Sequence, residues 1–150
     1  MEIRIVERGA FAIVGLKYRG KNEHNEIPQL WQALGPRTGE ITHLADDTAA
    51  YGINANMDME TGEWDYVAGF EVSSAEDVPQ GMVAFEVPAA KYAVFATTLP
   101  HVGETFQNAY HVWLPQAGYQ HSGGPEFELY DERFEVQDPT SEFDLYIPVS

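Results

Sequence analysis

Residues 82–95 read MVAFEVPAAKYAVF. Two apolar runs, Met82–Val87 and Tyr92–Phe95, are rich in β-branched and aromatic residues, which predicts two β-strands. The Pro88-Ala89-Ala90 link between them predicts a turn or bend, because proline cannot donate a hydrogen bond within a sheet. The rest of the chain can be placed around this pair of strands.

The same order of residue types stands near the start of the chain. Val6-Glu7 followed by Phe11–Val14 resembles Phe85-Glu86 followed by Tyr92–Phe95. The first copy predicts either two short strands or one long strand bent at Gly9-Ala10. A similar pair of strands in each half of the chain indicates an internal repeat.

A segment with one apolar face follows each pair of strands. The first covers Glu26–Leu34 and ends at Gly35-Pro36, and the second covers about Gly103–Leu114 and precedes Pro115. Apolar residues stand at i, i+3, i+4 and i+7 in both, namely Ile27, Leu30, Trp31 and Leu34, then Phe106, Ala109, Tyr110 and Trp113. Both segments therefore predict amphipathic helices, with tryptophans in matching places.

Two further strands follow each predicted helix. Tyr51–Met57 and Trp64–Val72 flank the polar link Asp58–Glu63, as in an antiparallel hairpin. Phe127–Phe134 and Phe143–Val149 close the second half. The chain thus predicts an α+β fold of two tandem βαββ motifs, with antiparallel sheets, a pseudo-two-fold axis and a central groove.

The two repeats cover about residues 1–78 and 79–150. The polar stretch Ser73–Gln80 that joins them is short, and no low-complexity linker interrupts the chain, so the sequence predicts one domain over residues 1–150. Ligand pockets favour seams between such units. An unpaired edge strand would allow a homodimer.

The composition is strongly acidic. The 150 residues carry 24 acidic and 8 basic side chains, a formal net charge of −16. This charge repels phosphate backbones and argues against direct nucleic-acid binding. No apolar run approaches the roughly 20 residues of a membrane-spanning helix, so we expect a cytoplasmic protein with no membrane partner.

Several motifs together are specific enough to indicate a family. They are Pro28-Gln29-Leu30-Trp31, Tyr51-Gly52-Ile53, Tyr66-Val67-Ala68-Gly69-Phe70-Glu71-Val72, Tyr92-Ala93-Val94-Phe95, Trp113-Leu114-Pro115 and Phe127-Glu128-Leu129-Tyr130. With the βαββ repeat, they make the chain resemble a GyrI-like domain, also called the effector-binding domain of AraC-type and MerR-type multidrug regulators. The resemblance covers essentially all 150 residues.

The resemblance implies a pair of SH2-like motifs around a groove that accepts lipophilic, often cationic compounds. It also implies an acidic residue in the floor of the groove, and the matching position is Glu128. Members of the family include drug-sensing domains of transcription activators, stand-alone binding proteins, a gyrase inhibitor and hydrolases of cyclopropane-containing toxins. We expect no fused DNA-binding domain, which would add about 50 to 100 residues, so regulation would need a separate transcription factor.

The residues around Glu128 agree with such a site. Alternation along the strand puts Glu128 and Tyr130 on one face and Phe127 and Leu129 on the other. If Phe127 and Leu129 pack under the helices, Glu128 projects into the seam, where burial raises its pKa unless a cation compensates. The alternative is a glutamate on a solvated sheet face.

Aromatic rings would supply the other half of a cation site, because a ring face attracts a lipophilic cation. Spacing alone favours an ordinary core position for Trp31 and leaves Trp113 and the others open. The proposed ligand-binding residues are Glu128, Tyr51, Trp64, Tyr66, Phe70, Tyr92 and Trp113.

Other chemistries have little support. Zero cysteines exclude thiolate metal sites and cysteine nucleophiles, and no serine lies in a G-x-S-x-G motif. The nearest approach to a metal cluster is His43 with Asp46-Asp47, which reads as a solvated loop. The sequence also contains no glycine-rich phosphate loop, so we expect no metal and no cofactor.

Three functions remain. The first is a stand-alone module that binds amphipathic, cationic aromatic compounds, with Glu128 as the counter-charge and no catalytic residue. The second is a hydrolase of reactive electrophilic toxins that uses Glu128 with Tyr66 or Tyr92. The third is an acidic module that docks on a protein partner, such as a transcription factor or gyrase. The sequence favours binding over catalysis.

Overall fold

The computed structural model describes residues 3–46 and 48–150. Within these ranges eight strands are present: β1 (Ile3–Arg8), β2 (Phe11–Gly20), β3 (Ala50–Ala55), β4 (Trp64–Val72), β5 (Val83–Val87), β6 (Ala90–Thr97), β7 (Glu126–Tyr130) and β8 (Phe143–Pro148). The first helix, α1 (Glu26–Leu34), continues into a 3-10 segment, η1 (Gly35–Glu40). The second helical run joins η2 (Leu99–His101), α2 (Val102–Asn108), a π-helical segment η3 (Ala109–Trp113) and α3 (Leu114–Ala117).

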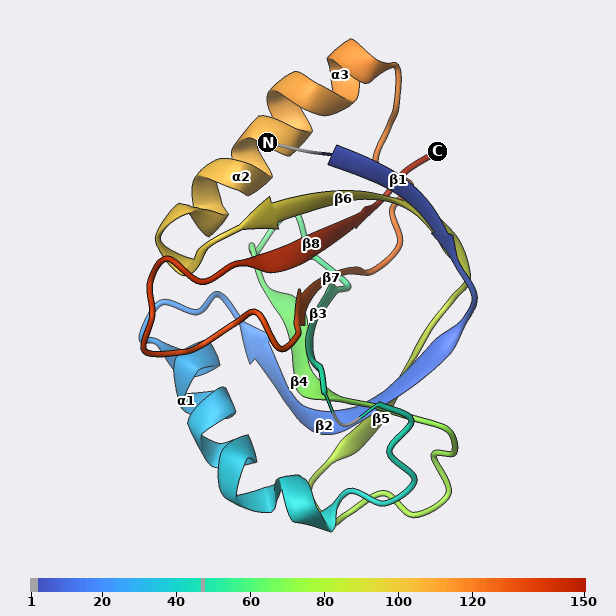
Figure 1. Cartoon of the computed structure of the whole chain (residues 1–150), viewed down its shortest axis with the longest axis vertical. Helices are drawn as coiled ribbons and strands as arrows, with labels where there is room; N and C mark the ends of the chain where they lie inside the picture. The colour runs from blue at the N-terminus through green and yellow to red at the C-terminus, as the bar shows by residue number, and fades with distance from the viewer. Residues whose placement is uncertain (1–2, 47) are drawn as a thin grey trace.

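All strands belong to one sheet in the order β1-β6-β8-β7-β3-β4-β2-β5, and each neighbouring pair is antiparallel. The sheet curves strongly, and the two helical runs lie on its outer side (Figure 1). The predicted α+β class with antiparallel pairing is confirmed. No helix in the described part of the chain is both long enough and apolar enough to cross a bilayer.

The two halves of the sheet have the same internal order. Strands β3 and β7 meet at the centre, and β4 and β2 follow β3 as β8 and β6 follow β7. The outermost strands are exchanged, because β1 pairs with β6 and β5 pairs with β2. The two similar segments of the sequence therefore pair with each other across the repeats. Val6 lies opposite Tyr92, and Ile13 lies opposite Phe85.

Each helical run covers one half of the outer face. Leu34 of α1 is buried against β2 and β4 in a cluster that includes Val14 and Tyr66. Ala109 and Leu114 of the second run are buried against β6 and β8. The helices leave the central strands, β3 and β7, between them (Figure 1).

Three predicted boundaries were wrong for local reasons. The second helix continues past Pro115 to Ala117 and ends at Gly118, whose φ is 79°. In a regular α-helix the ring of Pro115 would clash with the carbonyl group four residues earlier. The π-helical turn before Pro115 changes the hydrogen-bond register at this point. Strand β7 ends at Tyr130, because Asp131 starts a turn in which the Phe134 N–H donates to its carbonyl. Strand β3 ends before Asn56, which has a left-handed φ of 56°.

The concave side of the sheet has its own apolar core. Phe127 is 1% exposed there and its ring packs against those of Phe11, Tyr51, Tyr92 and Tyr146. The condition considered in the sequence analysis, that Phe127 and Leu129 pack under the helices, is not met, because both face this inner side. The alternation nevertheless turns Glu128 and Tyr130 to the outer side, between the helices.

We predict that Phe127→Ala lowers the free energy of unfolding by about 3–5 kcal/mol, because it removes a buried ring from a close-packed cluster. Chemical denaturation measures this change. Val136→Ala is the control: its side chain is 77% exposed, so the change should stay within about 0.5 kcal/mol. Equal effects of the two substitutions would contradict the assigned core.

Candidate functional site

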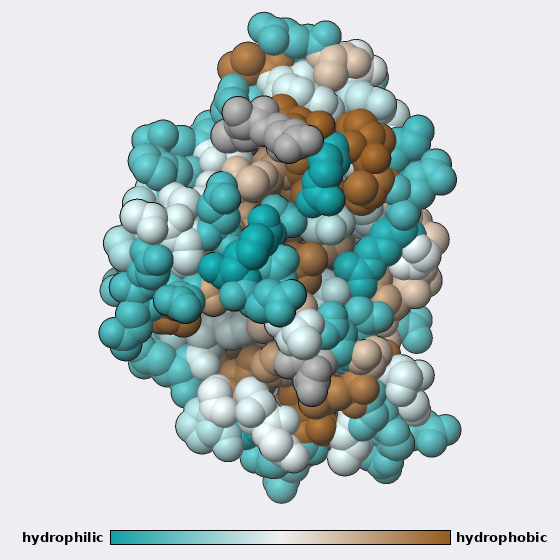
Figure 2. Space-filling view, viewed as in Figure 1, coloured by the Kyte–Doolittle hydropathy of each residue, from teal (hydrophilic) through white to brown (hydrophobic). Residues whose placement is uncertain are grey.

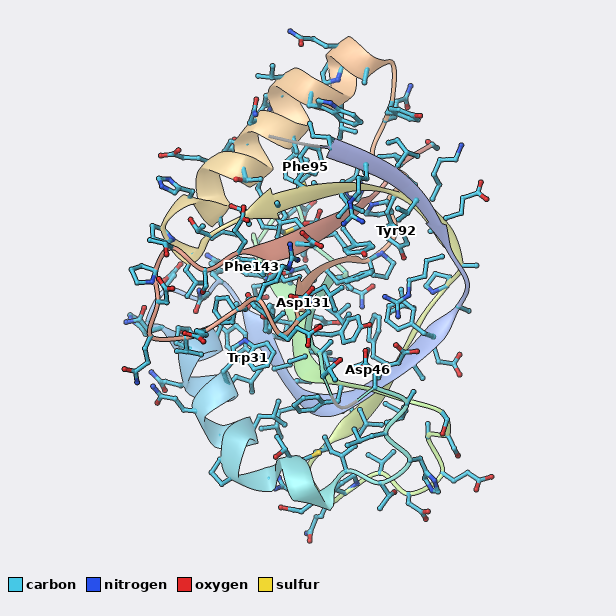
Figure 3. All side chains as sticks on the ribbon, viewed as in Figure 1. Trp31, Asp46, Tyr92, Phe95, Asp131 and Phe143 are labelled. Carbon is cyan, nitrogen blue, oxygen red and sulfur yellow. The ribbon has the colours of Figure 1, made fainter. Side chains whose placement is uncertain are left out.

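A cavity of about 880 Å³ lies between α1, the start of the second helical run and the central strands. Four of the proposed ligand-binding residues line it: Trp64, Tyr66, Phe70 and Glu128. Trp31 reaches it from α1 and Phe106 from α2, while Phe134 and Val136 reach it from the segment between β7 and β8. Figure 3 labels Trp31 beside α1 and Asp131 near the central strands.

Strand register brings the acidic group to the floor of this cavity. Glu128 of β7 stands opposite Gly52 of β3, which in turn stands opposite Ala68 of β4. A Cβ atom at Gly52 would lie 2.1 Å from the Tyr66 hydroxyl and 2.9 Å from Oε1 of Glu128. The glycine therefore leaves the space in which Tyr66 and Glu128 meet.

The Glu128 carboxylate is held by three hydrogen bonds. Its Oε1 accepts from the hydroxyls of Tyr66 at 2.9 Å and Tyr130 at 2.6 Å. Its Oε2 accepts from Nδ2 of Asn54 at 2.9 Å. Such bonds to a carboxylate fix its position and stabilise its charged form.

Two indole groups complete this network from outside. Nε1 of Trp31 donates to the Tyr66 hydroxyl at 3.0 Å, and Nε1 of Trp64 donates to Oδ1 of Asn54 at 3.0 Å. The Trp31 ring also meets the Tyr130 ring edge to face, with centroids 5.6 Å apart. The aromatic wall and the carboxylate are therefore one connected structure.

Burial dominates the electrostatics of the floor. Glu128 is 9% exposed, and desolvation raises the pKa of its carboxyl even though the three hydrogen bonds oppose this rise. Desolvation and the neighbouring Glu128 charge raise the pKa values of Tyr66 and Tyr130 above that of an ordinary phenol. Both phenols thus remain protonated donors at neutral pH.

The cavity offers no basic side chain to offset this carboxylate. Among the described residues, those that line the cavity include no lysine, arginine or histidine. The second acid at its edge, Asp131, is already paired with Arg133, whose Nε lies 2.9 Å from Oδ1. The floor therefore presents an acidic group whose charged form lacks a cationic partner.

Three proposed ligand-binding residues lie elsewhere. Tyr51 is buried on the inner side, where its hydroxyl accepts from Arg8 and donates to Glu71, and burial raises its pKa to about 12. Tyr92 is buried in the same inner core, inside the curve of the sheet (Figure 3). Trp113 stacks on Tyr119 and meets Phe95 edge to face, away from the cavity.

Sequence reasoning missed other lining residues. Trp31 was expected in the core because of its helical spacing, but α1 turns it toward the central strands and the cavity. Tyr130 carried a usable signal, since it shares the Glu128 face of β7. Asn54, Phe106 and Phe134 carried none, because their roles depend on strand register and on the paths of a helix and a loop.

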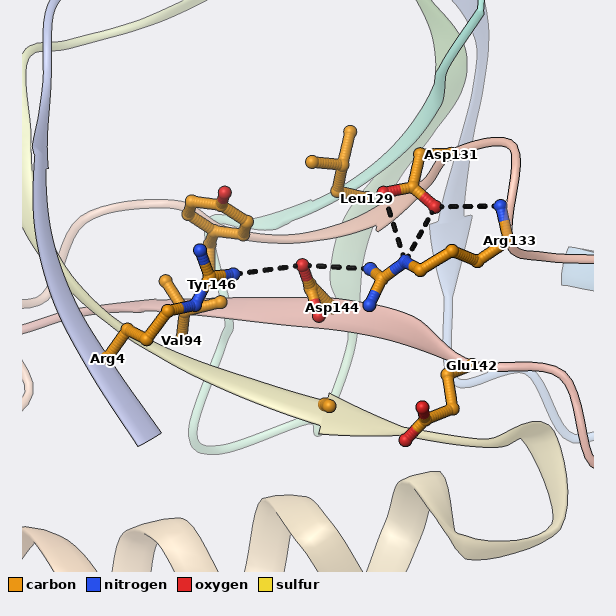
Figure 4. A pocket seen from close by; sticks show the side chains of 9 residues that line it. Arg4, Val94, Leu129, Asp131, Arg133, Glu142, Asp144 and Tyr146 are labelled. Atoms are coloured by element: carbon orange, nitrogen blue, oxygen red, sulfur yellow. Dashed lines mark hydrogen bonds and ion pairs between the residues drawn. The ribbon is translucent and has the colours of Figure 1, made fainter. Parts of the chain in front are cut away.

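A second, polar cavity of about 700 Å³ lies toward β6 and β8, and Asp131 is the one described residue that lines both cavities. Asp144 is central to it and forms ion pairs with Arg4 at 3.2 Å and with Arg133 at 2.9 Å (Figure 4). These ion pairs connect β1 and the segment after β7 to β8. The two cations and the carboxylates thus compensate one another locally.

No group of three potential metal ligands occurs within residues 3–46 and 48–150. Nε2 of His43 forms a hydrogen bond with Oδ2 of Asp77 at 2.9 Å. Asp47, part of the sequence cluster considered above, lies outside the described residues.

We predict that Gly52→Ala disrupts the Tyr66–Glu128 hydrogen bond and lowers the free energy of unfolding by about 1–3 kcal/mol, because the added methyl group overpacks the floor. Gly103→Ala in α2 is the matched control, since its new Cβ would meet no atom within 4 Å. It should be neutral or slightly stabilising. If Gly52→Ala and Gly103→Ala had the same free energy of unfolding, the close approach at Gly52 would be refuted.

The face seen in Figure 2 is mostly hydrophilic, with apolar residues showing in patches between polar ones. This distribution agrees with the acidic composition of the chain.

Known proteins share both sequence and architecture with this chain. The transcriptional regulator BrlR of Pseudomonas aeruginosa is 47% identical over 152 residues, which cover 99% of this chain and 56% of BrlR. The chain therefore spans little more than half the length of this relative.

Solved structures share the fold at lower identity. The structure of SAV2435 bound to tetraphenylphosphonium matches with a TM-score of 0.73 and 19% identity, over 100% of this chain and 94% of the other. An integron cassette protein from the mobile metagenome of Vibrio cholerae matches with a TM-score of 0.63 and 20% identity, over 99% and 95%.

The family assignment rests on nearly the whole chain. The model of the Cass2 family, described as integron-associated effector binding protein, matches residues 4–149. This confirms the resemblance to GyrI-like effector-binding domains that the motifs indicated. The chain belongs to the Cass2 family of effector-binding proteins.

Proposed function

We propose that this protein binds lipophilic aromatic cations in the 880 Å³ cavity. One observation carries the proposal: Glu128 is buried at the floor, and no basic side chain among the described lining residues pairs with it. A bound cation would stabilise the carboxylate in a region of low dielectric constant, where such pairing is strong.

The walls of the cavity suit the apolar part of such a ligand. Trp31, Trp64, Phe70, Phe106 and Phe134 present rings around the acidic floor. Ring faces attract a nearby cation by about 0.5–2 kcal/mol, and they cover apolar groups with little loss of conformational entropy. Tetraphenylphosphonium, which is bound in the SAV2435 structure, combines one positive charge with four aromatic rings.

We further infer that the chain is one domain of two SH2-like βαββ repeats, at about residues 1–78 and 79–150. The matching strand orders on the two sides of the β3–β7 pair support this division. The pseudo-two-fold axis would pass between β3 and β7, so the ligand groove would lie at the junction of the repeats. That position would explain why Asn54 and Tyr66 of the first half and Tyr130 of the second all donate to Glu128.

A role in regulation forms part of the proposal. The relative BrlR is a transcriptional regulator of which this chain matches a part. Ligand occupancy would then be transmitted to a DNA-binding segment or to a separate protein, since the excess of negative charge disfavours direct contact with DNA.

We predict that Glu128→Gln weakens binding of tetraphenylphosphonium by about 10- to 100-fold, because the substitution removes the charge and keeps the side-chain shape. Isothermal titration calorimetry measures the affinity. Tetraphenylmethane is too insoluble for a control, so neutral triphenylphosphine oxide serves, and its affinity should change less than threefold. If Glu128→Gln lowered the affinity for both ligands equally, the proposed electrostatic role of Glu128 would be contradicted.

The raised pKa of Glu128 also predicts proton-linked binding. Lowering the pH through this pKa neutralises the carboxyl, so cation affinity should fall there and should level off above it. Binding should lower the pKa and release protons in that range. Calorimetry in buffers of different ionisation enthalpy detects this release, which should vanish in Glu128→Gln; a release that persists in the variant would assign it to another group.

A hydrolase is the second candidate, because the Tyr66 hydroxyl lies 2.9 Å from Oε1 of Glu128 in a cavity large enough for a small electrophile. The carboxylate could activate water and a protonated phenol could stabilise the leaving group. Mass spectrometry of a cyclopropane-containing electrophile after incubation distinguishes the two functions. Hydrolysis adds the mass of water, which Tyr66→Phe should abolish, whereas a binding protein returns the compound intact.

A further inference from the structure

The hydrogen-bond acceptors at the floor of the cavity are already occupied. A carboxylate offers about four lone-pair positions, and three of those of Glu128 receive donors from Tyr66, Tyr130 and Asn54. Only one position, on Oε2, remains for a ligand. The carboxylate therefore offers its charge but little hydrogen-bonding capacity.

Two groups that bond to Glu128 also accept hydrogen bonds from other side chains. The Tyr66 oxygen accepts from Nε1 of Trp31, and Oδ1 of Asn54 accepts from Nε1 of Trp64. At the edge of the cavity, both carboxylate oxygens of Asp131 accept from Nε of Arg133. A ligand that reaches the floor thus meets the negative charge of Glu128, while the acceptors of Glu128, Tyr66 and Asn54 already have donors.

We propose that the site selects cations without N–H groups, such as quaternary ammonium and phosphonium ions, over primary ammonium ions of the same charge and aromatic framework. This inference rests on the proposed function and specifies its ligand class. Its basis is the saturation of the Glu128 carboxylate by Tyr66, Tyr130 and Asn54.

The selection follows from the cost of unpaired donors. A primary ammonium group carries three N–H donors, which water satisfies before binding. At this floor the Glu128 carboxylate would satisfy one, so the others would lose their partners on burial. A quaternary or phosphonium centre carries its charge without such donors, so its burial leaves no N–H group unpaired.

The experiment compares two biphenylmethyl cations that differ at nitrogen, biphenylmethyltrimethylammonium and biphenylmethylammonium. Calorimetry at a pH where the primary amine is fully protonated gives both affinities. We expect the quaternary ion to bind the wild-type protein at least about tenfold more tightly, equivalent to about 1.4 kcal/mol. Because the trimethylammonium group also buries more apolar area, the wild-type ratio alone does not decide the question.

Two variants separate hydrogen bonding from apolar area. Tyr130→Phe keeps the ring and frees a lone pair on Oε1, and Asn54→Ala frees one on Oε2. In each, the affinity ratio of quaternary to primary ion should fall at least about threefold, because the primary ion gains an acceptor. Tyr110→Phe is the matched control, since its hydroxyl bonds to Glu126 and not to Glu128; its ratio should equal that of the wild type.

The outcomes separate this inference from the function on which it rests. A fall of the ratio in either folded floor variant, with no fall in Tyr110→Phe, supports the selection. If both floor variants keep the wild-type ratio, or if the wild-type protein binds the primary ion as tightly as the quaternary ion, the selection is overturned while cation binding stands. If neither cation binds the wild-type protein, the proposed function falls and takes the inference with it.

Discussion

The buried carboxylate of Glu128 is the constraint on which the rest of the site depends. Moving a carboxylate out of water is costly, so proteins surround one with hydrogen-bond donors, pair it with a cation or let it bind a proton. This protein supplies donors from Tyr66, Tyr130 and Asn54 and supplies no basic side chain among the described lining residues. The raised pKa of Glu128 shows that the donors only partly offset burial. In the function proposed above, a bound cation would supply the positive charge that the described lining residues do not.

The architecture of the sheet holds that arrangement in place through contacts from both halves of the chain. Strand β7 of the second half joins β3 of the first, so Glu128 receives hydrogen bonds from Asn54 and Tyr66 of the first half and from Tyr130 of the second. The exchanged outer strands hold the halves together a second time, since β1 pairs with β6 and β5 with β2. The inner aromatic core around Phe127 supports β7 from behind. Helices α1 and α2 lie beside the central strands and do not cover them. The cavity lies between the two helices.

Much of this fold could be predicted from the sequence, because helix α1 and the order of the strands have strong local patterns. The apolar stripe of Glu26–Leu34 and the stop at Gly35-Pro36 gave the observed bounds of α1. The site was harder to predict because both faces of this sheet are covered, one by helices and the other by the curvature of the sheet itself. Apolar residues therefore occur on both faces of the sheet. For this reason the local sequence pattern does not distinguish Tyr66, which lines the cavity, from Tyr51 and Tyr92, which lie in the inner core. Glu128 was found through the family resemblance and strand alternation, whereas Asn54 became visible only through the register of β3.

The central claim is that Glu128 is the anionic partner of a bound cation. The most direct test is a ¹³C NMR titration of the glutamate side-chain carboxyl carbons, with and without tetraphenylphosphonium, in which Glu128→Gln identifies the relevant signal. The account predicts a pKa above the value of about 4.3 for an exposed glutamate in the free protein and a clear decrease when the cation is bound. A Glu128 signal that titrates identically in the free and saturated protein would contradict the account.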